Sequence, residues 1–514
     1  MTTLFDASVS SGDAHPDFPG ARVTPNDPRY DTLVRGFNLR WVGKPAYVQV
    51  CGTAEQVRYA VQQAVNARPQ LRVTVRGGGH CYEDFVSNND GGVIIDLSPL
   101  NGVFSPGGGY YCVEGGCTLW NVYTQLYKEY GVTMPAGSCY SVGAGGHIVG
   151  GGYGLLSRKY GLVIDHLYAV ELVYVAPNGQ AVLTTVTRDE DDPARRELFW
   201  AHQGGGGGNF GIVTRYWFKD LPPAPAWAYL TTVAWDWNGL TRAQFGELVT
   251  KYGRFFEQNS AVGSPYKDMF ALLHLTNYTA GQIGLTVQYV GTQPGLVDAF
   301  LDAISPGGVE RQALRVRVGY QHTTFPPPQN QHLPWLDATQ TLNGSGHNQR
   351  GKYKSAYMKR GFPPHQIGTL WKYLHDKKFY NTLALVQIDS YGCQINAVPS
   401  SATAIPQRSS IMKLQYQTYW IDKADDQKNL DWINGFYNEM YGPNGPVPDS
   451  VMDGCYVNYP DVDLKNWQLL YYGEAGYRRL QQVKARWDPL NVFHHKQSIE
   501  LPRDREGEAD NSDG

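Results

Sequence analysis

Leu71-Arg-Val-Thr-Val-Arg-Gly-Gly-Gly-His80 runs from a strand-like segment straight into a glycine-rich loop that ends in a reactive side chain. Upstream, residues 47–50 predict a short strand, and residues 54–67 carry apolar side chains at helical spacing, with Thr53 as a suitable N-cap. The order strand, helix, strand and glycine loop is typical of an α/β unit. Because glycine has no Cβ, the backbone N–H groups of such a loop can approach an anionic or planar ligand closely. This stretch therefore predicts an α/β ligand-binding unit.

A second reactive side chain stands in a second glycine-rich loop, Pro135-Ala-Gly-Ser-Cys139-Tyr-Ser-Val-Gly143. Taken alone, His80 fits an ordinary loop histidine, and Cys139 fits a small buried hydrophobic residue. Together, 59 positions apart and each at the rim of a glycine loop, they indicate a cofactor held at two points. The pair predicts a flavoenzyme.

Composition and charge set the broad class of protein. With 514 residues, 42% of them hydrophobic and 18% charged, the chain predicts a globular protein of two domains or more. A net charge of −3 argues against nucleic-acid binding, and no run of about 18 apolar residues predicts a transmembrane helix. The first residues lack the basic and apolar regions of a secretory signal, so we expect a cytoplasmic protein.

Two further patterns argue against other cofactors. The seven cysteines include Cys112 and Cys117, but no second pair at zinc-ligand spacing, so we expect no metal site. Gly206-Gly-Gly-Asn-Phe-Gly211 matches the dinucleotide pattern G-x-G-x-x-G, but no acidic residue follows about 20 positions later. We therefore expect no nicotinamide site there.

A series of ordered motifs resembles the flavin-linked oxidases of the berberine bridge enzyme type, within the vanillyl-alcohol oxidase superfamily. The resemblance covers most of residues 45–500. Besides the two loops above, it rests on Gly145-Gly-His-Ile-Val-Gly-Gly-Gly-Tyr-Gly154, Leu198-Phe-Trp-Ala201, residues 204–213, Tyr456-Val-Asn-Tyr-Pro-Asp461 and Asp488-Pro-Leu-Asn-Val-Phe493. It implies an α+β fold, in which a two-part FAD-binding domain carries an inserted α/β substrate domain built on an antiparallel sheet.

The composition changes where that insertion would begin. After residue 221 the glycine tracts stop, and tryptophan and tyrosine become more frequent. We expect residues 1–220 to form the FAD-binding domain as two α/β subdomains and residues 221–450 to bind substrate. Residues 451–500 would return to the FAD domain, and the polar residues 501–514 would be a disordered tail.

The resemblance implies FAD bound covalently at two residues. His80 would bond to the 8α-methyl carbon and Cys139 to C6 of the isoalloxazine, although attachment at only one of them remains open. The pyrophosphate would lie on backbone N–H groups of Gly77 to Gly79 and of the glycine tract at residues 143–150. Val142 implies access of O2 to the flavin and hence an oxidase that gives H2O2. The other expected cofactor-binding residues are Arg76, Gly77, Gly78, Gly79, Gly137, Ser138, Gly143, Gly146, His147, Gly150, Gly154, Val213 and Asn458.

Within the family, the chain resembles bacterial natural-product sugar and alcohol oxidases, such as glycopeptide hexose oxidases and aclacinomycin oxidoreductase. This implies hydride transfer to FAD from a hydroxyl-bearing carbon of a natural-product glycoside or oligosaccharide, in secondary-metabolite tailoring. Oxidative cyclisation of an alkaloid or polyketide is the alternative.

Four tyrosines match expected catalytic positions. Tyr459 would be the base and Tyr391 and Tyr153 its partners, with Tyr456 as an alternative base. Since an ordinary tyrosine has a pKa near 10, the base needs a neighbouring tyrosine, a cation or the flavin to act at neutral pH.

Two departures from the family pattern fall in the substrate half. Cys393 stands where a glycine is common, and Gln407 where a histidine is common. They leave the identity of the substrate open. We expect a small-molecule substrate and O2 as partners, no membrane, and a monomer or homodimer.

Overall fold

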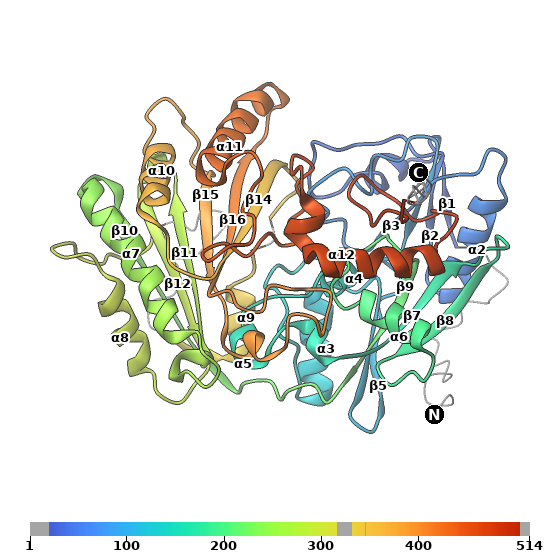
Figure 1. Cartoon of the computed structure of the whole chain (residues 1–514), viewed down its shortest axis with the longest axis horizontal. Helices are drawn as coiled ribbons and strands as arrows, with labels where there is room; N and C mark the ends of the chain where they lie inside the picture. Colours follow the sequence, from blue (N-terminus) through green and yellow to red (C-terminus); the bar gives the residue numbers. More distant parts are fainter. Residues whose placement is uncertain (1–19, 316–330, 345, 504–514) are drawn as a thin grey trace, which may run out of the picture.

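A computed structural model of the chain describes residues 20–315, 331–344 and 346–503 (Figure 1). Most of the expected tail, residues 504–514, and the N-terminal segment in which a secretory signal would stand lie outside the described residues. The described elements form three β-sheets and the helices that cover them.

The first sheet is the predicted α/β unit. Its strands are β1 (Arg22–Val23), β2 (Tyr47–Val50), β3 (Val73–Arg76) and β4 (Val93–Asp96), in the order β1-β2-β4-β3, with α1 (Tyr30–Leu33) between β1 and β2. Both β2 and β3 pair with β4 in parallel, so the predicted strand, helix and strand are confirmed. Helix α2 (Ala54–Asn66) begins at Thr53, whose side chain accepts a hydrogen bond from the N–H of Gln56.

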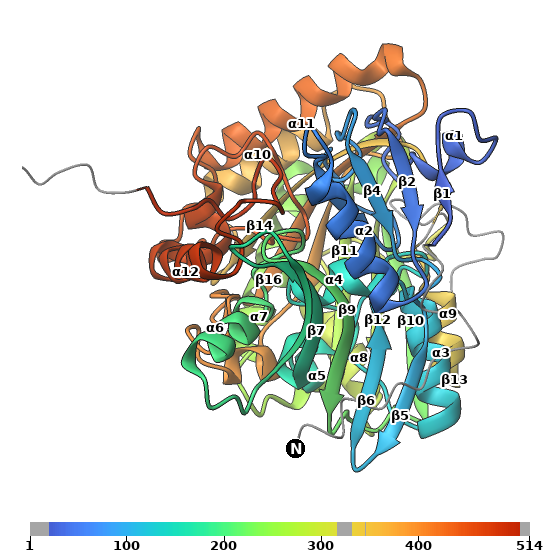
Figure 2. The same ribbon diagram turned by 90° about the vertical axis from the view of Figure 1, so that its right-hand side faces the viewer.

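The second sheet is antiparallel and lies beside the first (Figure 2). Its order is β5-β6-β9-β7-β8, from β5 (Val103–Gly107), β6 (Tyr110–Glu114), β7 (Leu167–Val175), β8 (Ala181–Thr187) and β9 (Ile212–Lys219). Helix α2 packs between the two sheets, where Val57 and Val61 share a core with β-strand residues such as Ile95 and Val173. The remaining helices of this region are α3 (Leu119–Tyr130), α4 (Ala144–Val149), α5 (Ser157–Tyr160) and α6 (Pro193–Ala201).

The third sheet is the antiparallel sheet expected for the substrate half. It contains β10 (Trp227–Asp236), β11 (Met269–Thr276), β12 (Gln282–Tyr289), β13 (Gln331–Pro334), β14 (Arg350–Met358), β15 (Leu385–Ser390) and β16 (Met412–Trp420). Their order is β13-β10-β12-β11-β15-β16-β14. The accompanying helices are α7 (Arg242–Asn259), α8 (Gly295–Ile304), α9 (Trp335–Thr341), α10 (Pro364–Leu374) and α11 (Asp426–Tyr441). The boundary that we expect near residue 221 falls between the last strand of the second sheet and the first strand of this one.

Alternate residues of β16 face opposite ways. Tyr416 packs against Phe436 and Tyr437 of α11, which places that helix on one face of the sheet. Lys413, Gln415 and Gln417 turn to the other face, as the two-residue period of a strand requires. This second face lies toward the first two sheets, so the sheet presents its polar side chains to the interior of the molecule.

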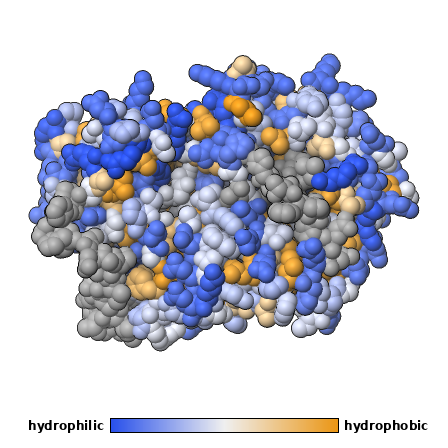
Figure 3. Space-filling view, turned by 180° about the vertical axis from the view of Figure 1, so that it is seen from behind, coloured by the Kyte–Doolittle hydropathy of each residue, from blue (hydrophilic) through white to orange (hydrophobic). Residues whose placement is uncertain are grey.

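The C-terminal segment returns to the first half of the chain. Helix α12 (Trp467–Trp487), interrupted at Gly473, contacts α6, and the N–H of Ile499 donates to Asn209 Oδ1 (Figure 1). The coloured part of the surface in Figure 3 is mainly hydrophilic, with hydrophobic residues in small separate groups. In the parts of the chain that the structure describes, no helix is long and apolar enough to cross a membrane.

The two glycine loops that hold His80 and Cys139 meet at Gly78 and Gly143. A Cβ added to Gly78 would lie 2.2 Å from the backbone nitrogen of Gly143, and one added to Gly143 would lie 2.3 Å from that of Gly78. Only glycine at both positions allows this contact, because the opposing atoms belong to the backbone. The spacing of the two reactive residues therefore depends on this contact.

Gly78→Ala should force the two loops apart. We expect the free energy of unfolding to fall by about 3 kcal/mol, the upper range for overpacking a tight interior. Thermal and denaturant unfolding would measure the loss. Gly295→Ala is the matched control, since a Cβ there meets no atom within 4 Å and the backbone is not in the left-handed region. Equal stability of Gly78→Ala and Gly295→Ala would contradict the role of the contact.

Candidate active site

A cavity of about 410 Å³ lies between the glycine loops and the polar face of the third sheet. One side is formed by backbone-rich segments around residues 76–82, 137–147 and 206–213. The other is formed by residues 456–460 and six side chains of the sheet, which are Phe270, Gln387, Asp389, Gln415, Gln417 and Tyr419. The cavity thus joins a glycine-lined region to a polar and aromatic region.

His80 lies on this cavity in a fixed orientation. Its ring stacks on Phe37, with ring centroids 4.5 Å apart, and its Nε2 lies 2.7 Å from Ser141 Oγ. Burial lowers the pKa of His80 to about 4. The imidazole is therefore neutral at pH 7 and keeps a lone pair on one ring nitrogen.

Cys139 lines the same cavity. The adjoining N–H of Tyr140 donates to Asn343 Oδ1 over 3.0 Å, so the segment after α9 holds this loop. Burial raises the pKa of Cys139 to about 11, although a hydrogen bond from the backbone of Gly344 acts in the opposite direction. Cys139 is therefore a thiol at neutral pH.

The expected glycines serve two different purposes. Gly146 is exposed to the cavity, and a Cβ there would meet no protein atom within 4 Å, so this backbone is open to a ligand. Gly154 also lines the cavity, but the place of a Cβ there is taken by the carbonyl of Ala136. Gly150 faces the side chain of Asn458 and is absent from the residues that line the cavity. The other expected residues on the cavity wall are Arg76, Gly77, Gly78, Gly79, Gly137, Ser138, Val142, Gly143, His147, Val213 and Asn458.

Arg76 orients its loop through protein contacts. Its Nε donates to Asp96 Oδ2 over 2.9 Å, and its guanidinium also reaches the carbonyl oxygens of Leu33 and Arg35. Since Asp96 is the partner of Arg76 across the parallel strands, this ion pair fixes the end of β3 where the glycine loop begins.

His147 and Asn458 join the glycine tract to the tyrosine motif. The N–H of Gly137 donates to His147 Nε2 over 3.1 Å, and Asn458 Nδ2 donates to the carbonyl of His147 and to the Tyr456 hydroxyl. Burial, together with the charge of Lys413, lowers the pKa of His147 to about 4. His147 is therefore a neutral part of the wall.

The structure places a buried cation beside Tyr459. Lys413 Nζ donates to the Tyr459 hydroxyl over 3.0 Å and lies 4.3 Å from the centre of its ring. The same ammonium pairs with Asp389 Oδ2 at 2.5 Å, because the two residues are partners across β15 and β16. Burial raises the pKa of Tyr459 well above its ordinary value, and the charge of Asp389 adds to the shift. Burial also lowers the pKa of Lys413, against the attraction of Asp389.

The other three tyrosines differ in what their hydroxyls contact. Tyr456 lines the cavity, and its hydroxyl accepts a hydrogen bond from Asn458. Tyr153 also lines the cavity, but its hydroxyl donates to the carbonyl of Ser390. Tyr391 is fully buried, donates to the carbonyl of Gln407 and is absent from the cavity wall. The geometry thus brings Tyr459, Tyr456 and Tyr153 together and leaves Tyr391 behind them.

Sequence reasoning missed a row of polar side chains on the sheet. Gln387 donates to Asp389, Gln417 donates to Gln387 and to Gln415, and Gln415 donates to the Tyr82 hydroxyl. The alternation of polar residues at 413, 415 and 417 was the available signal, since it predicts a strand with one polar face. A polar face that is buried indicates a lined cavity.

The two departures from the family pattern lie away from this row. Cys393 has φ of +55°, in the left-handed region that glycine adopts without steric strain. This backbone conformation explains why glycine is common at this position. Gln407 donates to the carbonyls of Leu470 and Tyr471 and is absent from the cavity wall.

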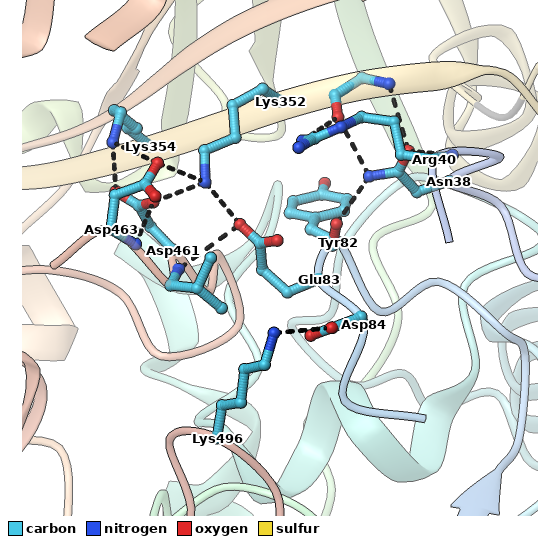
Figure 4. A network of polar contacts seen from close by, with 12 residues as sticks. Asn38, Arg40, Tyr82, Glu83, Asp84, Lys352, Lys354, Asp461, Asp463 and Lys496 are labelled. Carbon is cyan, nitrogen blue, oxygen red and sulfur yellow. Dashed lines mark hydrogen bonds and ion pairs between the residues drawn. The ribbon is translucent and has the colours of Figure 1, made fainter. Parts of the chain in front are cut away.

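A buried cluster of charges joins strand β14 to residues that follow His80 and Tyr459 in the sequence (Figure 4). Lys352 Nζ lies 2.6 Å from Glu83 and 2.7 Å from Asp461, and Lys354 lies 2.6 Å from Asp461. All four side chains are at most 4% exposed, whereas the fifth member, Asp463, is 46% exposed. Glu83 follows His80 by three residues and Asp461 follows Tyr459 by two, so the cluster joins both segments to β14.

The charged state of the cluster follows from its contacts. Burial alone would raise the pKa of Asp461. The charges of Lys352 and Lys354 have a larger effect in the opposite direction and hold this pKa at about 2. Burial raises the pKa of Glu83, although its ion pair with Lys352 acts in the opposite direction. In the sequence, Tyr353 stands between the two lysines. Its ring stacks on that of Tyr82, with ring centroids 3.6 Å apart.

The wall of the cavity fits a long, partly anionic and partly flat group such as FAD. Gly146 leaves backbone open to a ligand, and His80 and Cys139 stand at the wall where a ring could lie between the loops and the sheet. Comparisons with known proteins agree with this fit. Residues 45–185 match a family model described as FAD binding domain, and residues 455–500 match one described as Berberine and berberine like.

The chain is similar over nearly its whole length to characterised oxidases. It is 43% identical to an aclacinomycin-N/aclacinomycin-A oxidase of Streptomyces galilaeus, over 93% of this chain and 89% of that protein. It is 38% identical to a hexose oxidase of Chondrus crispus, over 92% and 93%. A solved glycopeptide hexose oxidase complexed with teicoplanin superposes with a TM-score of 0.85 at 38% identity, over 93% of this chain and 98% of that one.

The fold and these relatives define the class. The chain belongs to the berberine bridge enzyme-like family of FAD-linked oxidoreductases, and it is an FAD-binding oxidase of the α+β architecture that the motifs imply.

Asp461→Asn should weaken the charge cluster strongly. We expect the free energy of unfolding at pH 7 to fall by about 3–5 kcal/mol, the range for removing one partner of a buried ion pair. The difference in the free energy of unfolding between wild type and variant should narrow as the pH falls from about 4 toward 2. The reason is that the pKa of Asp461 is about 2 in the folded protein and near 3.9 in the unfolded chain. Denaturant unfolding at pH 7, 4 and 3 would measure this.

Asp463→Asn is the control within the same cluster. Since Asp463 is half exposed, its loss should cost about 1 kcal/mol or less. Similar losses of unfolding free energy for the two variants at pH 7 would show that the buried contacts stabilise the fold no more than the exposed one does.

Proposed function

We propose that the protein oxidises a hydroxyl-bearing carbon of a natural-product glycoside or oligosaccharide in secondary-metabolite tailoring. Bound FAD would accept the hydride and pass the electrons to O2, which becomes H2O2. The observation that carries the proposal is the contact of Lys413 with Tyr459 at the polar wall of the cavity.

Tyr459 is the base in this proposal. A buried phenol is protonated at neutral pH, so it needs a stabilised phenolate to take a proton from a substrate hydroxyl. Lys413 supplies that stabilisation through a hydrogen bond of 3.0 Å and through its charge near the ring. Asp389 keeps the ammonium in place from the neighbouring strand. Tyr456, whose ring centre lies 5.0 Å from that of Tyr459, is the alternative base.

The substrate class is supported by the polar row on the sheet. Amide and carboxylate groups of Gln387, Asp389, Gln415 and Gln417 offer donors and acceptors along one wall, which suits a ring with several hydroxyl groups. The similar proteins named above act on aclacinomycins or hexoses according to their names, and one is complexed with a glycopeptide.

We further propose that FAD is attached at both His80 and Cys139. Both side chains line the cavity, and His80 is neutral at pH 7, so its imidazole is available as a nucleophile. Two bonds would hold the cofactor while one side of the cavity stays open to a large substrate.

Double attachment predicts that acid precipitation leaves the yellow chromophore on wild-type protein. The intact mass should exceed that of the polypeptide by about one FAD. His80→Ala and Cys139→Ala should each retain covalent flavin through the other residue, and the double variant should release all of it. Release of flavin from denatured wild type would contradict covalent attachment. Release from one of the single variants would show that wild type forms only one of the two bonds.

Tyr459→Phe should lower kcat by at least about 100-fold, as expected for loss of a general base. Lys413→Met should move the rise of activity to higher pH, because the phenolate loses its cation and the pKa of Tyr459 rises further. Steady-state H2O2 production across pH, on a panel of glycosylated natural products, oligosaccharides and free hexoses, would measure both effects.

Tyr391→Phe is the matched control for the base. Its hydroxyl contacts a backbone carbonyl behind the cavity wall, so we expect kcat within about threefold of wild type, the effect of one ordinary hydrogen bond or less. Full activity of Tyr459→Phe would reject it as the base. Absence of both peroxide and anaerobic flavin bleaching on every substrate would reject the oxidation of hydroxyl-bearing substrates.

A further inference from the structure

The side chain of His80 is held on two sides by residues that have no place in the reaction. Phe37 covers one face of the imidazole at an interplanar angle of 18°, and the N–H of Phe37 donates to the carbonyl of Gly79. Ser141 Oγ lies 2.7 Å from Nε2, at the edge of the ring. The ring can therefore neither tilt nor turn freely.

These contacts leave one nitrogen for bonding. Among the residues that the structure describes, none forms a hydrogen bond with Nδ1 of His80, whereas Nε2 is taken by Ser141. A neutral imidazole carries its proton on one nitrogen and its lone pair on the other. When Nε2–H donates to Ser141 Oγ, the lone pair is on Nδ1.

We infer that Ser141 is a positioning residue for flavin attachment, which holds the Nε2 edge of His80 by a hydrogen bond so that Nδ1 forms the bond to the 8α carbon. The inference rests on the proposed covalent attachment at His80. Ser141 is absent from the cavity wall, so it acts through His80 and not on the cofactor.

The position of Ser141 links the two attachment loops. It follows Cys139 by two residues, and its carbonyl oxygen would lie 2.7 Å from a Cβ added to Gly78. The loop that presents Cys139 thus also orients the ring of His80. One loop would in this way set the geometry of both bonds.

The attachment step balances as an oxidation. The Nδ1–C8α bond forms, one C–H bond of the 8α methyl group breaks, and the imidazole loses its Nε2 proton. Two electrons and two protons leave in total, and O2 accepts them as H2O2, the oxidant that the oxidase already uses. After the step Nε2 carries a lone pair, and the Ser141 hydroxyl can turn to donate to it. Serine suits both stages because its hydroxyl accepts and donates.

The experiment isolates the histidine bond in a Cys139→Ala background, where His80 alone can hold flavin. Cys139→Ala and Ser141→Ala/Cys139→Ala would be purified with added FAD and compared by intact mass at several times. We expect the covalent fraction to form at least about fivefold more slowly without Ser141, the effect of losing one hydrogen bond of ordinary strength. Ser141→Thr in the same background should restore the rate, because threonine keeps the hydroxyl.

The site of the bond gives a second readout that is independent of activity and rate. Digestion to the His80 peptide, followed by NMR of the flavin peptide, distinguishes Nδ1 from Nε2 linkage. We expect Nδ1 linkage alone in Cys139→Ala and in Ser141→Thr/Cys139→Ala. Ser141→Ala/Cys139→Ala should instead give a mixture of both nitrogens, because no hydrogen bond from residue 141 then holds the Nε2 edge of the ring.

Tyr140→Phe is the matched control. It removes a neighbouring hydroxyl that has no hydrogen-bond partner among the described residues, so it should change neither the rate nor the nitrogen used. An unchanged rate and pure Nδ1 linkage in Ser141→Ala/Cys139→Ala would overturn the role of Ser141 while leaving covalent attachment intact. Absence of any His80 bond in Cys139→Ala would instead reject the proposed attachment at His80, and this inference with it.

Discussion

The buried contacts of Lys352 with Glu83 and Asp461 are the constraint on which the site depends (Figure 4). They join three parts of the chain that are far apart in sequence, namely the loop after His80, strand β14 and the motif that contains Tyr459. Charges taken out of water are tolerated when each has a close partner, so separating these segments would leave buried charges unpaired. The distance between the attachment residue and the base depends on these contacts.

The histidines on the cavity wall and the ion pair on the sheet differ in charge. At the attachment end, burial keeps His80 and His147 neutral at pH 7. On the sheet, Lys413 and Asp389 stay paired within hydrogen-bond distance of each other. A full charge is therefore kept beside Tyr459, where the proposed reaction moves a proton.

Local patterns in the sequence predicted the parts of the structure that depend on neighbouring residues. The strand at residues 47–50, helix α2 with its cap at Thr53, and the two glycine loops all follow from spacing and residue type. Lys413 and Lys352 could not be found in this way, because their partners come from other strands or from distant loops. Motif resemblance named the tyrosines, but only the folded chain shows that the Tyr391 hydroxyl lies behind the wall and that a cation lies beside Tyr459.

The row of amides on β15 and β16 has a direction. An ionised carboxylate only accepts hydrogen bonds, so Asp389 makes Gln387 turn its NH2 toward it and its oxygen toward Gln417. Gln417 then donates to Gln415 as well, and Gln415 is left to donate to Tyr82. Asp389 is also the partner of Lys413 in an ion pair, so one salt bridge stands at the end of the row from which its polarity is set. That end decides which atoms a ligand meets as donors and which it meets as acceptors.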